Sequence, residues 1–197
     1  MMVWHVLLLL VGLGHNYSMP TSSMQPTIMR GSLFEMQATR LYGLLPFGLS
    51  RPFQPGDVIV FYNRPTGELY IKRVVAIAGD RVQMWEGRLY INGEVVSRTV
   101  VRTAEDMDSL NTVVPVTVYT ETLPNGYAHL INEIGDDQPL DSTDEYVVPD
   151  GHLFALGDNR DRSADSRVLS QVGYVPVEDV VAFSRKDDAL FYWWHGR

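Results

Sequence analysis

Short apolar runs separated by turn-forming residues follow one another along most of the chain, a pattern typical of β structure. The runs predict strands at 58–62, 70–78, 81–85, 88–91, 94–96, 112–121, 127–131, 146–156 and 173–183. Turn signals separate them, among them Gln54-Pro55-Gly56-Asp57, Asn92-Gly93 and Pro124-Asn125-Gly126. No amphipathic pattern longer than three helical turns follows residue 20, so we expect a mostly β fold.

The stretch 97–145 differs from its surroundings because it is more polar and ends in a group of acids. These acids are Glu133, Asp136, Asp137, Asp141, Asp144 and Glu145. We interpret 97–145 as a β-rich insertion or small subdomain, with the acids on a solvated loop. The main β domain is then formed by 18–96 and 146–190, and 191–197 is a C-terminal tail.

The first fourteen residues, MMVWHVLLLLVGLG, are apolar except for His5. As a helix they would span about 21 Å, whereas a bilayer core about 30 Å thick normally takes about 20 residues. The segment shows neither the basic start nor the small-residue cleavage site of a secretory signal. We favour a short membrane anchor over 1–17, and a truncated anchor or a buried helix are the alternatives.

Composition narrows the function classes. The chain has 197 residues and 22.3 kDa, with 45% hydrophobic and 20% charged residues, which is typical of a folded domain with a core. A net charge of −8 argues against a general nucleic-acid binder, which would carry a basic patch. The chain contains no cysteine, which excludes a disulfide framework, a thiolate metal site and a cysteine nucleophile. No metal-ligand spacing is present, so no metal or other cofactor is expected.

Lysine is rare in this chain, because fourteen of its sixteen basic residues are arginine and the two lysines are Lys72 and Lys186. Lys72 lies inside the apolar run 70–78, where its side chain is either buried or reaches along the protein to solvent. Burial would lower its pKa from about 10.4 by roughly 3–5 units. A buried Lys72 would therefore be a suitable general base near neutral pH.

Two further segments carry groups that such a base would need. Residues 19–27 place several hydroxyls between Pro20 and Pro26, which restrict the backbone on either side. The loop 157–167 alternates acids with arginines after a glycine. Each segment taken alone is equally consistent with an ordinary turn, Ser/Thr-rich in the first case and salt-bridged in the second.

Together, these segments resemble the sequence boxes of the bacterial type I signal peptidases (leader peptidases), the membrane-bound serine proteases that remove signal peptides from exported proteins. Pro-Thr-Ser-Ser-Met-Gln-Pro-Thr, from residue 20, is similar to the nucleophile box P-S-G-S-M-x-P-T. Tyr-Ile-Lys-Arg-Val-Val-Ala-Ile-Ala-Gly-Asp, from residue 70, is similar to the lysine box Y-I-K-R-V-V-x-x-x-G-D. Gly-Asp-Asn-Arg-Asp-Arg-Ser-Ala-Asp-Ser-Arg, from residue 157, is similar to the closing box G-D-N-R-D-N-S-x-D-S-R. The boxes stand in the family's order, and the resemblance extends from residue 18 to about 183.

The resemblance implies a signal-peptidase-like antiparallel β catalytic domain, with a β-rich insertion and a short N-terminal membrane helix. It also implies a Ser-Lys dyad without histidine, in which Ser23 matches the nucleophile and Lys72 the general base. The Thr21 hydroxyl and the Ser23 backbone N–H match the oxyanion hole, and Ser163 matches the hydroxyl that orients the lysine. Supporting charged residues are implied at Arg73, Asp158, Asp165 and Arg167. The substrate pocket is implied at Met19, Met24, Ile28, Tyr70 and Ile71.

The implied substrates are preprotein signal peptides with small residues at −1 and −3, because shallow apolar pockets exclude bulky side chains. The lipid bilayer is a further implied partner, whereas nucleic acid is not. The implied location is the bacterial inner (cytoplasmic) membrane, with the catalytic domain on its periplasmic side. The resemblance implies no cofactor and no metal.

Three positions depart from the boxes. Ser22 replaces the glycine before the nucleophile, which would be unfavourable if that position needs a positive φ. Ser32 follows Gly31 where Asp is usual, which would weaken a local turn. Arg162 replaces a common Asn, and we expect its side chain to point to solvent.

Several alternatives remain open at this point. One is a specialised relative that matures a dedicated substrate such as a conjugative pilin, and another is a catalytically inactive relative that binds export partners. The mechanistic alternative is a Ser-His-Asp enzyme that uses His129 or His152, although no serine lies in a G-x-S-x-G elbow.

Overall fold

The computed structural model describes residues 14–39, 52–107, 112–185 and 192–193. This part of the chain is built mainly from strands, and the two helices described in it are single 3-10 turns, η2 (Arg160–Arg162) and η3 (Val177–Asp179). The mostly β prediction is therefore confirmed.

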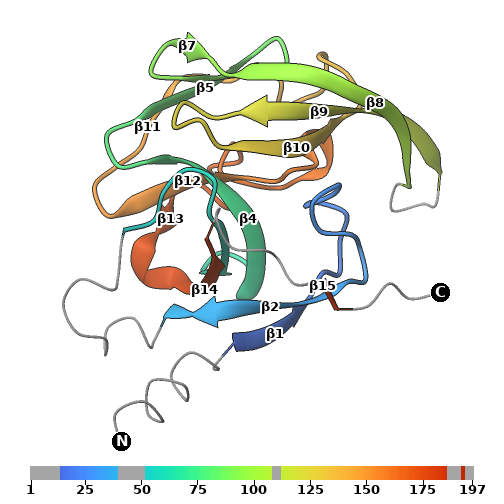
Figure 1. Cartoon of the computed structure of the whole chain (residues 1–197). Coiled ribbons are helices and arrows are strands. Elements are labelled where there is room, and N and C mark those ends of the chain that lie inside the picture. Colours follow the sequence, from blue (N-terminus) through green and yellow to red (C-terminus); the bar gives the residue numbers. More distant parts are fainter. Residues whose placement is uncertain (1–13, 40–51, 108–111, 186–191, 194–197) are drawn as a thin grey trace, which may run out of the picture.

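The largest sheet forms the lower half of the molecule in Figure 1. All of its pairs are antiparallel. Its order is β1 (Gly14–Ser18), β2 (Leu33–Ala38), β14 (Val180–Ser184), β3 (Val58–Asn63), β4 (Glu68–Ile77), β12 (His152–Leu156) and β13 (Val175–Pro176), with β15 (Tyr192–Trp193) also pairing with β2.

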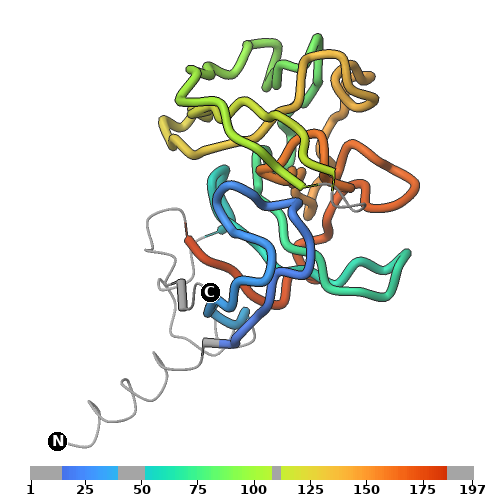
Figure 2. Tube along the Cα trace, turned by 90° about the vertical axis from the view of Figure 1, so that its right-hand side faces the viewer, coloured from blue at the N-terminus to red at the C-terminus, as the bar shows by residue number. Residues whose placement is uncertain are grey.

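Two smaller antiparallel sheets lie above it (Figure 1). One has the order β11 (Tyr146–Val147), β5 (Arg81–Trp85), β6 (Arg88–Ile91) and β7 (Glu94–Val95). The other has the order β10 (Ala128–Glu133), β9 (Val113–Thr122) and β8 (Ser97–Met107), and the tube in Figure 2 shows that it remains separate from β1 and β2. The strands of this second sheet fall inside the stretch 97–145, while the division into catalytic domain, insertion and tail stays a prediction.

Strand β4 is central to the core, because three buried apolar clusters meet on it. Ile71 belongs to the cluster beneath β1 and β2, Val74 to the cluster with β3 and β14, and Val75 to the cluster with β5 and β6. Six consecutive β4 residues, 71–76, are buried, as expected for a strand covered on both faces. Lys72 lies within this run, so its backbone is held by packing on every side.

Several sequence predictions need correction. The 11-residue strand β8 was not predicted, because its alternating polar residues are mostly exposed and leave no apolar run. The predicted strand 146–156 is interrupted between β11 and β12, where Gly151 has a φ of 74°, and 173–183 is likewise split into β13 and β14. The acid cluster is also not a wholly solvated loop, because Glu133 and Asp141 are each 3% exposed.

The predicted anchor over 1–17 falls mostly outside the described residues. Its last four positions, from Gly14, belong to strand β1 and not to a helix. In the described ranges, no helix has both the length and the apolar character needed to cross a bilayer.

A buried ion pair joins the three-stranded sheet to the loop 157–167. Arg160 Nη1 donates to Glu121 Oε1 at 2.8 Å, and Nη2 donates to Oε2 at 2.5 Å. The side chains of Arg160 and Glu121 are 1% and 2% exposed. Removing only one member of such a pair strongly destabilises the fold, because the remaining charge stays buried without its partner.

We therefore predict that Glu121→Ala lowers the free energy of unfolding by about 3–5 kcal/mol, measured by denaturant titration. The control is Glu178→Ala, which breaks the exposed pair with Arg64 and should leave the unfolding midpoint unchanged. Equal stability of the Glu121 variant and the control would contradict this account of the sheet's attachment.

Candidate active site

The first feature of the site is a contact between a serine and a lysine that lie 49 positions apart in the chain. Lys72 Nζ lies 3.0 Å from Ser23 Oγ and 2.9 Å from the backbone oxygen of Ile71, to which it donates. Ser23 is 6% exposed and Lys72 is 4% exposed. The two side chains are thus removed from bulk water and within hydrogen-bond distance, so a neutral amine could accept the hydroxyl proton.

Local packing fixes the loop that carries Ser23, residues 19–32, which we call the serine loop. Met24 and Ile28 follow the serine in the chain, and both are fully buried in the cluster beneath β1 and β2. The loop is closed by two backbone bonds, Gln25 N–H to Ser22 O at 3.0 Å and Ile28 N–H to Met24 O at 2.8 Å. Burial of apolar neighbours therefore holds a polar residue in place.

The pKa of Lys72 is lowered to about 8. Burial is the main cause, since it disfavours the charged ammonium. The carboxylates of Asp165 and Asp158 act in the opposite direction, and Arg167 lowers the pKa further. A neutral amine is thus accessible close to neutral pH. Of the two possibilities that the sequence left open for the Lys72 side chain, the structure shows the buried one.

Thr21 lies beside the serine. Its hydroxyl donates to Ser23 Oγ at 3.2 Å and accepts a long bond, 3.4 Å, from the Ser23 backbone N–H. The two groups expected at the oxyanion hole, the Thr21 hydroxyl and the Ser23 N–H, therefore lie next to each other and next to the candidate nucleophile.

Ser163 is 5% exposed, and its hydroxyl has no hydrogen-bond partner among the described residues, Lys72 included. It nevertheless lies close to the serine loop. A Cβ placed on Gly157 would come within 2.2 Å of Ser163 Oγ and 2.5 Å of Ser23 O. Gly157 is therefore the residue that lets Ser163 and the backbone of Ser23 approach each other, and any side chain there would separate them.

The four charged residues expected around the dyad form two buried pairs. Arg73 donates to both oxygens of Asp158 at 2.8 and 2.7 Å. Arg167 donates to both oxygens of Asp165 at 2.8 and 2.9 Å. Burial alone would raise the pKa of each carboxyl, but the charge and hydrogen bonds of its arginine outweigh burial and hold the pKa below its ordinary value.

The expected pocket residues divide between two clusters. Met19, Met24, Ile28 and Ile71 lie together in the cluster beneath β1 and β2. Tyr70 packs instead against the cluster of β3 and β14, and Lys72 Nζ lies 5.5 Å from the centre of its ring. The alternation of β4 explains the division, because Tyr70 and Lys72 share one face and Ile71 points to the other.

Neither histidine of the Ser-His-Asp alternative is bonded to the serine. Within the described ranges, Ser23 Oγ has Lys72 and Thr21 as its hydrogen-bond partners. His129 is 7% exposed, and burial lowers its pKa to about 4. The Nδ1 of His152 lies 2.9 Å from the backbone oxygen of Asp150, on a different strand from Lys72.

The departures from the boxes have structural outcomes. Ser22 is not among the described residues with a positive φ, so its Cβ meets no left-handed strain. The turn before Ser32 is closed by a bond from its N–H to Met29 O at 3.1 Å. The expectation for Arg162 was wrong, because its side chain is only 13% exposed and lies 3.5 Å from Asp106 of β8.

Sequence reasoning missed three residues that touch the serine loop or its partners: Gly157, Asn159 and Asp106. Gly157 and Asn159 stand in the closing box, but the resemblance implied roles only for charged residues of that box and for Ser163. No sequence signal points to Asp106, because its contact with the loop arises only from the path of the unpredicted strand β8.

Comparisons with known proteins bear on the family of the chain. The family model described as "Signal peptidase, peptidase S26" matches residues 1–186. A signal peptidase I from Rickettsia prowazekii is 34% identical over 200 residues, covering 90% of this chain and 70% of the relative. The corresponding protein of Rickettsia akari is 32% identical with the same coverage. A crystal structure of a signal peptidase I from Enterococcus faecalis is 26% identical, covers 66% of this chain and 94% of that chain, and has a TM-score of 0.38.

The chain thus belongs to the signal peptidase family, peptidase S26. Membership supports an activity as a serine endopeptidase that removes signal peptides. It does not favour the dedicated pilin-maturing relative or the inactive binding relative as alternatives.

The pKa of Lys72 predicts a pH profile. A base must be neutral to accept a proton, so below pH 8 the ammonium form should predominate and kcat/KM should fall about tenfold per pH unit. Above about pH 9, where the amine is mostly neutral, kcat/KM should become independent of pH. The profile is measured with a peptide substrate, and His129→Gln serves as the control that should keep the same limb. A limb near pH 4 that disappears in the His129 variant would contradict the lysine as base.

Proposed function

We propose that this chain cleaves signal peptides from exported preproteins through a Ser23–Lys72 dyad. The observation that carries the proposal is the 3.0 Å contact between a buried serine hydroxyl and a buried lysine amine whose pKa is about 8. An unperturbed lysine, with a pKa near 10.4, would be almost wholly protonated at neutral pH and unable to serve as a base.

The reaction follows from this contact. Ser23 Oγ attacks the scissile carbonyl carbon while neutral Lys72 accepts its proton, which gives a tetrahedral oxyanion. Collapse of this intermediate breaks the C–N bond, and the Lys72 ammonium donates its proton to the leaving amine. The product is an acyl-enzyme and a neutral lysine, which then deprotonates a water molecule for hydrolysis of the ester.

The oxyanion would be stabilised by the Ser23 N–H and the Thr21 hydroxyl, whose proximity to Ser23 Oγ supports the assignment. Ser163 is assigned the role of orienting the amine. Its buried hydroxyl without a partner among the described residues, held close to the Ser23 backbone across Gly157, supports this role. Arg73, Asp158, Asp165 and Arg167 support the site as two neutralised pairs.

The substrates are proposed to carry small residues at −1 and −3. Support comes from Met19, Met24, Ile28 and Ile71, which pack together in one buried apolar cluster, because apolar walls of this kind exclude bulky side chains sterically. We also propose an association with the lipid bilayer, on the periplasmic side of the bacterial inner membrane. Met29 lies in the serine loop and Leu33 directly follows it, and their exposure, 49% and 48%, supports contact with an apolar surface.

The decisive experiment incubates the purified chain with a preprotein and sequences the new N-terminus of the product. We expect one cut after a small residue, which Ser23→Ala and Lys72→Ala should each abolish. Lys72→Arg should be inactive as well, because a guanidinium stays protonated at every working pH. Circular dichroism of the variants controls for folding, and substantial turnover by Lys72→Arg would exclude Lys72 as the base.

Thr21→Val tests the oxyanion assignment, because valine keeps the shape of threonine and removes the hydroxyl. We expect kcat to fall by about 10²–10³-fold with KM little changed. The matched control is Ser22→Gly, which alters the adjacent residue and should be tolerated. If Ser22→Ala abolished activity while Ser23→Ala did not, the neighbouring serine would be the nucleophile.

A further inference from the structure

Two backbone carbonyls of the serine loop are held by one residue of the closing loop (157–167). The Asn159 backbone N–H donates to Ser23 O at 3.1 Å, and its side-chain Nδ2 donates to Ser22 O at 3.1 Å. Ser22 O also accepts the Gln25 N–H, so this carbonyl is held from within the loop and from outside it. Asn159 is fully buried, so its own donor groups are shielded from competing water.

The orientation of Asn159 is in turn determined by Asp106 of β8. The second hydrogen of Asn159 Nδ2 is donated to Asp106 Oδ2 at 2.8 Å. A carboxylate only accepts hydrogen bonds, so it requires the NH₂ end of the amide, and not its oxygen, to face this side. Asp106 itself is held by the Met107 N–H on Oδ1, at 2.8 Å, and by Arg162 at 3.5 Å from Oδ2.

The bond to Ser22 O bears directly on the reaction, because Ser22 O and the Ser23 N–H belong to the same peptide unit. A peptide unit is planar, so fixing the carbonyl at one end fixes the direction of the N–H at the other. That N–H is the backbone donor assigned to the oxyanion. Without Asp106, the NH₂ group of Asn159 loses one of its two acceptors, so the amide is held less firmly against Ser22 O.

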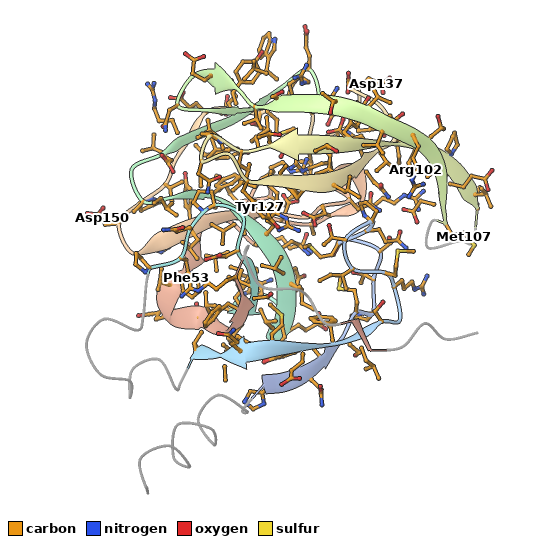
Figure 3. The ribbon with its side chains drawn as sticks, in the orientation of Figure 1. Phe53, Arg102, Met107, Tyr127, Asp137 and Asp150 are labelled. Carbon is orange, nitrogen blue, oxygen red and sulfur yellow. The ribbon has the colours of Figure 1, made fainter. Side chains whose placement is uncertain are left out.

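We propose that Asp106 is a positioning residue, which acts through Asn159 to aim the Ser23 N–H at the oxyanion. The inference rests on the proposed function for its catalytic consequence. It gives the three-stranded sheet a role in the chemistry, since β8 passes over the serine loop between Arg102 and Met107 (Figure 3). A cavity of about 580 Å³ lies between Gln25, Pro26 and Met29 of that loop and the sheet, so side-chain packing across it is incomplete and the polar link through Asn159 contributes to the connection.

Three variants test the proposal. Asp106→Ala removes the acceptor and should lower kcat by about 10- to 100-fold with KM nearly unchanged, because oxyanion stabilisation acts in the transition state alone. Asp106→Asn retains an oxygen that can accept from Asn159 and should keep kcat within about threefold of the wild type. Glu105→Ala, at the exposed neighbouring position on β8, is the matched control and should have no effect.

Two further readouts separate positioning from a general loss of structure. The limb of the pH profile assigned to Lys72 should stay in place in Asp106→Ala. Hydrogen-exchange mass spectrometry should show about tenfold faster exchange of the Asn159 and Gln25 amides, with the amides of β4 and β12 unchanged. Unchanged kcat and unchanged exchange in Asp106→Ala would overturn the proposal, as would an Asp106→Asn variant as slow as Asp106→Ala.

Wild-type protein and Ser23→Ala are measured in the same preprotein assay, so that the two claims can fail separately. If wild-type protein cleaves and Ser23→Ala does not, the proposed function stands and the Asp106 variants decide the inference alone. If wild-type protein cleaves nothing, the proposed function fails, and the exchange of the Asn159 and Gln25 amides still decides whether Asp106 holds the loop.

Discussion

Burial of one amine is the constraint on which the rest of the site depends. Lys72 is the only lysine among the described residues, and it lies on the one strand where three core clusters meet. Desolvation there disfavours the ammonium form, which lowers the pKa to about 8. A site built this way needs a rigid apolar frame, because any opening that admitted water would restore the charged form.

The same constraint explains the neighbouring ion pairs. Carboxylates near a lysine raise its pKa, and Asp158 and Asp165 both act on Lys72 in this direction. Each is paired in bidentate fashion with its own arginine, Arg73 or Arg167, whose positive charge opposes that of the carboxylate. The arginines thus do more than satisfy buried acids, since without them the acids would favour the ammonium form.

The extent to which the sequence predicted this structure depended on the range of the interactions involved. Strands β3 to β6 and their turns followed from apolar runs and from signals such as Asn92-Gly93, whose residues both have positive φ. Ser23 and Lys72 followed from the family's boxes. The exposed strand β8 left no apolar pattern, and the link from Asp106 to Asn159 crosses 53 positions, so neither could be inferred from local residues. Arg162 was misplaced for the same reason, because its partner lies on that strand.

The close approach at Gly157 joins parts of the chain that are far apart in sequence. The serine loop and the closing loop meet there, and the bond from Asn159 to Ser22 O spans 137 positions. Contacts of such long range form only once the intervening chain has folded, since each must overcome a large loop-closure entropy. In a partly synthesised or partly folded chain the Ser23 hydroxyl and the Lys72 amine are therefore not yet held together, and the proposed dyad forms only when folding is complete.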